Sequence, residues 1–258
     1  MCLMKRILSA AAVLALSASL LVGCSSGTAS SVPVSASSAA ESTVSSVEET
    51  ASSAVDENEA AAAQLLNDLT GSYQELWPVI LADEYKQTWL DDCTALVGED
   101  NAEAAFEKLS SMVTGDVYGE DAVKAYANGG GAYFCGFTNS LATLTFDGET
   151  STISGTDKDG NVLFSHTYHY IGMEPVRGLY EFESDDADSG EFTYFFLAPD
   201  TSAETYHIEF RYGSDADALS QYDAGDYAYW LASGISTDCD QTMIDNCIKL
   251  FCTENLAG

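Results

Sequence analysis

The spacing of apolar side chains along the chain changes from a helical period to a strand period. Between residues 81 and 128 the apolar positions recur every three or four residues, as they do on one face of an α-helix. Leu81, Tyr85, Trp89 and Cys93 show this spacing most clearly. The pattern predicts three helices: one starting near residue 82, one over residues 102–112 with Asn101 as its N-cap, and one over residues 119–128.

Beyond residue 132 apolar and polar side chains alternate, which is typical of half-buried β-strands. The predicted strands cover residues 140–146, 151–155, 162–172, 179–184, 191–197 and 205–212. Turn sequences separate them, such as Asp147-Gly148 and Asp159-Gly160. Helical spacing returns at residues 218–230 and 240–254. The order of these elements predicts a mainly β domain with flanking helices, built as a small antiparallel barrel or sandwich.

The first 24 residues have the features of an export signal. Lys5 and Arg6 precede an apolar run over residues 7–22, which is short for a membrane-spanning helix. The run ends in Leu-Val-Gly-Cys at residues 21–24, which resembles the lipobox of bacterial lipoproteins. We therefore expect residues 1–23 to be removed and Cys24 to be lipidated. The resemblance implies anchoring at the outer face of the bacterial cytoplasmic membrane, with the outer membrane as the alternative.

The composition divides the remaining chain into a tether and a domain. Residues 24–58 are rich in Ser, Ala and Glu and lack aromatic side chains, so we expect a disordered tether. Residues 59–258 are enough chain for one domain with a substantial core. The chain has 9 Lys and Arg against 41 Asp and Glu, a net charge of −32. Such a charge excludes a nucleic-acid partner on electrostatic grounds, and it favours cations.

Two of the seven cysteines lie outside the expected folded domain, since we expect Cys2 to be removed with the signal and Cys24 to carry the lipid. The other five are Cys93, Cys135, Cys239, Cys247 and Cys252. In an exported protein they allow up to two disulfides, and the spacing leaves the pairing open. The sequence contains neither a phosphate-binding Gly-rich loop that opens a helix nor a Gly-x-Ser-x-Gly elbow, so we expect no enzymatic activity.

Several short segments resemble the ZinT family, also called YodA, whose domain also occurs fused to zinc-binding lipoproteins of the AdcA type. The similar segments are residues 71–78 (GSYQELWP), 122–126 (AVKAY), 177–182 (RGLYEF), 197–199 (LAP) and 206–208 (YHI). The resemblance implies a lipocalin-like antiparallel β-barrel, preceded by short helices and closed by C-terminal helices. It also implies capture or buffering of zinc or another divalent metal ion, with a metal-uptake transporter as partner.

The family's three histidine ligands correspond to Phe195, Thr205 and His207 in this sequence, so the resemblance implies a degenerate site. Strand alternation puts His207 on the same face as Glu209, which makes the two a candidate pair of ligands. His166 and His169 lie three apart in another predicted strand. They point to opposite faces, so only one of them can join His207 in the lumen of the barrel.

Two other interpretations of these residues remain open. Isolated histidines among aromatic residues often form ordinary hydrogen bonds without binding metal. A barrel that has lost its metal site can instead bind a small organic ligand. The aromatic residues that favour this alternative are Tyr168, Tyr170, Tyr194, Phe195 and Phe196.

Overall fold

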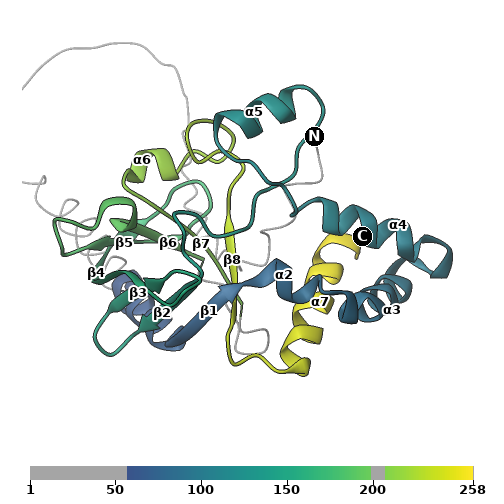
Figure 1. The fold of residues 1–258 in the computed structure, drawn as a ribbon, viewed down its shortest axis with the longest axis horizontal. Helices are drawn as coiled ribbons and strands as arrows, with labels where there is room; N and C mark the ends of the chain where they lie inside the picture. Colours follow the sequence, from purple (N-terminus) through teal and green to yellow (C-terminus); the bar gives the residue numbers. More distant parts are fainter. Residues whose placement is uncertain (1–56, 199–206, 258) are drawn as a thin grey trace, which may run out of the picture.

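The computed structural model describes residues 57–198 and 207–257. Eight antiparallel strands form a closed barrel, each strand pairing with its neighbours in the sequence and β8 closing onto β1 (Figure 1). The strands are β1 (Gly71–Glu75), β2 (Thr143–Asp147), β3 (Thr152–Thr156), β4 (Val162–Met173), β5 (Tyr180–Ser184), β6 (Tyr194–Leu197), β7 (His207–Gly213) and β8 (Ala232–Ser236). The predicted fold class, a mainly β barrel with flanking helices, is confirmed.

The helices lie on the outside of this barrel. They are α2 (Leu76–Ile80), α3 (Lys86–Val97), α4 (Glu99–Ser111), α5 (Glu120–Ala127), α6 (Ala216–Leu219) and α7 (Gln241–Leu256), with 3-10 turns at Asp83–Tyr85 and Gly190–Phe192. Residues 57–68 are also helical. Helices α3, α4 and α7 gather on one side of the barrel, next to α2 (Figure 1). We call α2, α3, α4 and α7 the helical lobe.

Aromatic side chains fill the lumen of the barrel. Phe195, Phe210 and Tyr212 are fully buried, and their rings lie 5.3–6.4 Å apart between centroids. The paired register places Phe195 opposite Tyr212 and Leu197 opposite Phe210, and residues that face each other across a ladder point to the same side of the sheet. This packing forms the larger of two hydrophobic cores.

The second core lies between the helical lobe and the outer face of β8. Trp89 of α3 is its most buried aromatic residue, and its indole Nε1 donates to the carbonyl oxygen of Ile80 at 2.7 Å. Phe251 of α7 packs edge-on against Trp77 of α2, with ring centroids 4.7 Å apart. The outward side chain of Ile235 in β8 belongs to the same core, which joins the lobe to the barrel.

The predicted helices and strands are largely confirmed, but two of the predictions are wrong in detail, and β1, β8 and the helix over residues 57–68 were not predicted. Gly98, not Asn101, precedes α4, and Asn101 lies inside the helix with its amide donating to the carbonyl oxygen of Val97. The helix expected over residues 218–230 is replaced by the short α6 and a series of turns. The buried guanidinium of Arg211 donates to the carbonyl oxygens of Leu219 and Tyr227, so a side chain, not the backbone of a helix, satisfies these two carbonyls.

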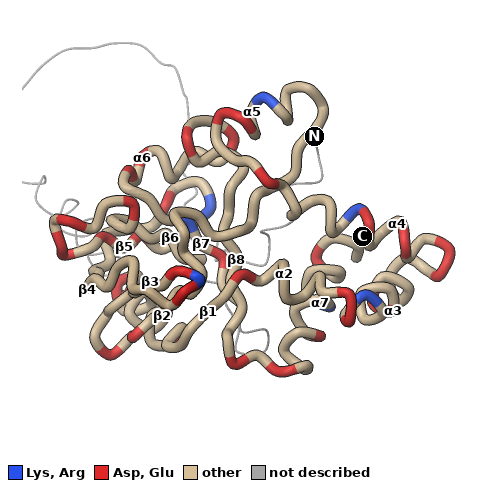
Figure 2. Tube along the Cα trace, viewed as in Figure 1, with Lys and Arg blue, Asp and Glu red and all other residues tan. Residues whose placement is uncertain are grey.

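Acidic side chains are distributed over the strand connections and the helices, and basic ones are few (Figure 2). Within the described ranges, no helix has the length and hydrophobicity needed to cross a membrane. The predicted lipidation at Cys24, the signal and most of the tether lie outside the described residues.

Candidate functional site

The two histidines of β4 are each paired with a carboxylate of the loop after β5. His166 Nδ1 lies 2.8 Å from Asp186 Oδ2, and His169 Nδ1 lies 2.7 Å from Asp185 Oδ1. The two rings are on opposite faces of the strand, as predicted: His166 is opposite Ile153, which faces the lumen, whereas the side chain of His169 is 52% exposed. The structure therefore keeps the two histidines apart.

His207 and Glu209 project from the same face of β7, as the alternation predicts. Their ladder partners in β8 are Ile235 and Ser233, and Ile235 belongs to the core beneath the helical lobe. His207 and Glu209 therefore face outward from the barrel, so the expectation that His207 faces the lumen is wrong. His207 faces outward because Ile208, Phe210 and Tyr212 occupy the inward positions of β7.

One pocket contains both His207 and Glu209, between β7 and helices α2 and α7. Its other walls are mainly apolar. They comprise Leu76, Trp77, Ile80, Cys247, Leu250, Phe251 and Glu254. Glu254 adds a second carboxylate from α7. The sequence did not indicate this residue, because its position depends on how α7 packs against the barrel. Neither His166 nor His169 lines this pocket.

The positions that correspond to the family's histidines do not converge in this structure. Phe195 shares its face with Tyr212 and points into the lumen, whereas His207 is on the opposite face of the sheet. Thr205, the third position, lies outside the described residues. Of these three positions, the two that the structure describes, Phe195 and His207, therefore lie on opposite faces of the sheet.

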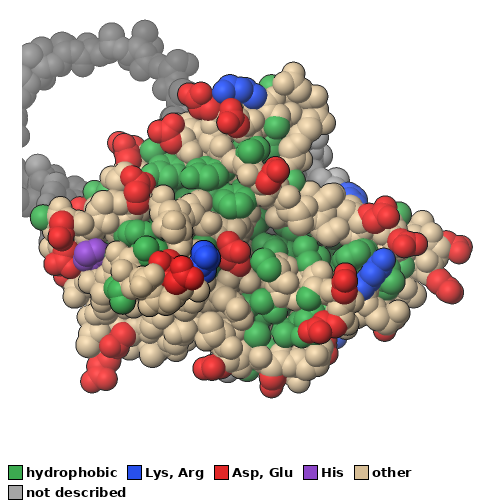
Figure 3. Space-filling model, viewed as in Figure 1, with side chains coloured by type: hydrophobic (Ala, Val, Ile, Leu, Met, Phe, Trp, Pro, Cys, Tyr) green, Lys and Arg blue, Asp and Glu red, His purple; other side chains and the backbone are tan. Residues whose placement is uncertain are grey.

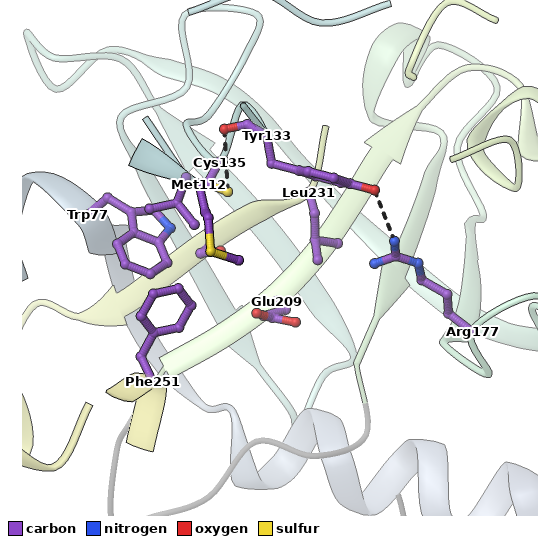
Figure 4. Close-up of a pocket in the computed structure, with 10 residues that line it drawn as sticks. Trp77, Met112, Tyr133, Cys135, Arg177, Glu209, Leu231 and Phe251 are labelled. Carbon is purple, nitrogen blue, oxygen red and sulfur yellow. Dashed lines mark hydrogen bonds between the residues drawn. The ribbon is translucent and has the colours of Figure 1, made fainter. Parts of the chain in front are cut away.

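A second pocket adjoins the first and continues along the seam between the barrel and the helical lobe. Trp77 and Phe251 lie at one end of it, Glu209 on its floor and Arg177 at the other end (Figure 4). Arg177 Nη2 donates to the hydroxyl of Tyr133 at 3.3 Å. Figure 3 shows hydrophobic side chains gathered on this face, between the barrel and the lobe. The seam therefore combines apolar walls with one cation and one carboxylate.

Two cysteines line these pockets, and both hold their protons at neutral pH. Burial, together with the nearby carboxylate of Glu209, raises the pKa of the Cys135 thiol far above its usual range. Burial likewise raises the pKa of Cys247 to about 12. Since a thiolate is the form that binds metal, neither sulfur is prepared as a ligand at neutral pH.

The donors of the first pocket can offer imidazole nitrogen and carboxylate oxygen to a cation. Among residues 57–198 and 207–257, however, no three His, Cys, Asp or Glu side chains are close enough to form a metal-binding group. The described part of the chain therefore supplies two adjacent ligands from β7, with Glu254 in the same pocket. It does not supply a complete tetrahedral set.

No protein-family model matches the chain. No curated protein matches it either. Among solved structures, the Zn(II)-bound ZinT-like domain of Streptococcus pneumoniae AdcA is similar over 70% of this chain and 87% of that domain, with 14% identity and a TM-score of 0.44. The Zn(II)-bound AdcA from Streptococcus pneumoniae is similar over 72% of this chain, at 14% identity and a TM-score of 0.43.

This chain spans 35% of the length of that AdcA structure.

Proposed function

We propose that this protein is an exported lipoprotein, anchored through Cys24, that binds zinc or another divalent metal ion at the outer face of β7. His207 and Glu209 are the proposed ligands. The observation that carries the proposal is that both side chains project from one strand face into the same pocket. The role we propose is capture or buffering of the ion outside the cytoplasm, for delivery to a metal-uptake transporter.

The donor chemistry of this pair fits zinc. Imidazole nitrogen and carboxylate oxygen both bind zinc at about 2.0–2.2 Å, and ligands at positions i and i+2 of a strand lie on one face about 6.6 Å apart along the backbone. Two such ligands leave coordination positions for water. The net charge of −32 raises the concentration of cations near the surface. A site with two protein ligands favours exchange of the ion over permanent retention.

Zinc is expected to raise the melting temperature of the full-length protein. At a free concentration 100 times the dissociation constant, one bound ion stabilises the fold by about 2.7 kcal/mol, which corresponds to roughly 5–10 °C for a domain of this size. The shift should saturate at one ion per chain and disappear in His207→Ala. It should be reduced in Glu209→Gln.

His169→Ala is the control, because this histidine is half-exposed, is paired with Asp185 and lies outside the pocket. It should keep the full shift. If wild type shows no shift with any first-row divalent metal, or if His207→Ala responds as wild type does, the proposal is wrong.

The alternative function is binding of a small organic ligand. The second pocket, along the seam, favours this function. The lumen does not, because buried rings already occupy it. Phe251 and Leu231 offer apolar contact, and Arg177 offers a cation with no carboxylate within ion-pair distance among the described residues. These walls fit a molecule with an apolar body and one anionic group.

An aromatic sulfonate dye tests this alternative. 8-Anilinonaphthalene-1-sulfonate should bind saturably at one site, with fluorescence enhancement, and Arg177→Met should weaken its binding about tenfold or more, equivalent to the loss of one charge-assisted contact. His169→Ala should leave it unchanged. Weak binding without saturation, or equal binding by Arg177→Met, would exclude this pocket as the ligand site.

A further inference from the structure

The cysteines of the domain are concentrated in one of its two cores. Cys93, Cys135, Cys247 and Cys252 are buried in the core of the helical lobe, and Cys239 packs against it. The barrel core, which is larger, contains none of the described cysteines. A disulfide within this core would join helices of the lobe to one another and would therefore stabilise the lobe directly.

Two of these sulfurs are neighbours across the packed helices α3 and α7. Cys93 Sγ and Cys252 Sγ lie 3.9 Å apart, and both residues are fully buried. They are 159 positions apart in the sequence. A disulfide bond is about 2.05 Å long, so the two sulfurs need to approach by about 2 Å, which side-chain rotation with a small helix shift can supply.

The surroundings of this pair favour a disulfide over a thiolate metal site. Burial raises the pKa of both thiols, so the charged form that a metal requires is disfavoured. No third metal-binding side chain lies close enough to complete a site within the described chain. A disulfide carries no charge and suits this apolar core, which also contains the fully buried Trp89 and Ile248.

We propose that Cys93 and Cys252 form a disulfide that joins α3 to α7 and so stabilises the packing of the helical lobe.

The oxidant is a small-molecule or protein disulfide. The thiolate of one cysteine attacks a sulfur of that disulfide and releases one thiol, giving a mixed disulfide. The thiolate of the second cysteine then attacks the protein sulfur of the mixed disulfide and releases the other thiol. The protein loses two protons and two electrons, which reduce the oxidant. Since neither sulfur is exposed in the fold, the exchange takes place before the lobe closes.

Refolding the full-length protein in a mixture of reduced and oxidised glutathione tests this proposal. After denaturation without reductant, free thiols are alkylated with iodoacetamide and the peptides are mapped by mass spectrometry. The expected product is a cross-linked peptide pair containing Cys93 and Cys252. Reduction should lower the melting temperature by roughly 5–15 °C, as expected for removing a typical disulfide from a domain of this size.

Cys135→Ala is the control, since this buried thiol shares the core but should be absent from the cross-link. It should keep the bond and the effect of reduction, whereas Cys93→Ala should lose both. The wild-type peptide map decides the question even if a cysteine variant fails to fold. Alkylation of both Cys93 and Cys252, or a bond from either of them to another cysteine, would overturn the proposal. The outcome does not depend on metal binding by His207.

Discussion

Phe195→Ala is expected to lower the free energy of unfolding by about 3–5 kcal/mol, the range for removing a fully buried aromatic side chain. Phe195 is 0% exposed and contacts rings from three directions: Phe164, Tyr168 and Tyr212 lie within 6 Å between centroids. Close packing on all sides leaves little room for the barrel to collapse around the cavity. Urea denaturation followed by circular dichroism measures the loss.

Val162→Ala is the control for this prediction, because Val162 is 70% exposed in the same barrel and its truncation should cost less than about 0.5 kcal/mol. Phe195→His adds a second test. Although the family resemblance places a zinc ligand here, the side chain points into the lumen, so histidine should destabilise the barrel without increasing zinc affinity. A gain in affinity would show that residues 195 and 207 approach each other, contrary to the register described above.

Trp89→Ala is expected to have a similar effect on the second core, again about 3–5 kcal/mol. Trp89 is fully buried, and its ring lies 5.6 Å from that of Phe106 and 6.0 Å from that of Phe251. It therefore links α3, α4 and α7, and its loss removes contacts from every long helix of the lobe. Chemical denaturation of the variant checks the magnitude.

Trp89→Phe separates packing from hydrogen bonding at this position. Phenylalanine keeps most of the ring contacts but leaves the carbonyl oxygen of Ile80 without the indole donor, so a smaller loss of about 1–3 kcal/mol is expected. If alanine costs no more than phenylalanine, or if either variant matches wild type, Trp89 does not hold the lobe together as described.

Periodic patterning predicted the elements in which one face is strongly apolar. The six strands between residues 140 and 212 and helices α3, α4 and α7 belong to this group. Strands β1 and β8 were missed because they are short and contain glycine or small residues, so their alternation is weak. The helix at residues 57–68 was missed because its composition merges with that of the tether, although Leu65 and Leu66 are buried in the barrel core.

The candidate site was only partly predictable for a similar reason. Alternation within one strand was enough to place His207 and Glu209 together, since it depends only on local geometry. The opposite face of β7 carries Ile208, Phe210 and Tyr212, which fill the lumen. The expectation that His207 lies in the lumen came from the family resemblance and not from the alternation. The contributions of Glu254 and Phe251 arise from the packing of α7 against the barrel, and both residues lie more than forty positions after Glu209 in the sequence.

Calorimetric titration of Zn²⁺ into the full-length protein, beside His207→Ala and His169→Ala, shows whether His207 binds zinc. We expect one saturable site per chain in the wild type and in His169→Ala. His207→Ala should lose at least tenfold in affinity, because it removes one of two protein ligands. Equal affinity in the wild type and His207→Ala, or loss of binding in His169→Ala alone, would contradict the proposal.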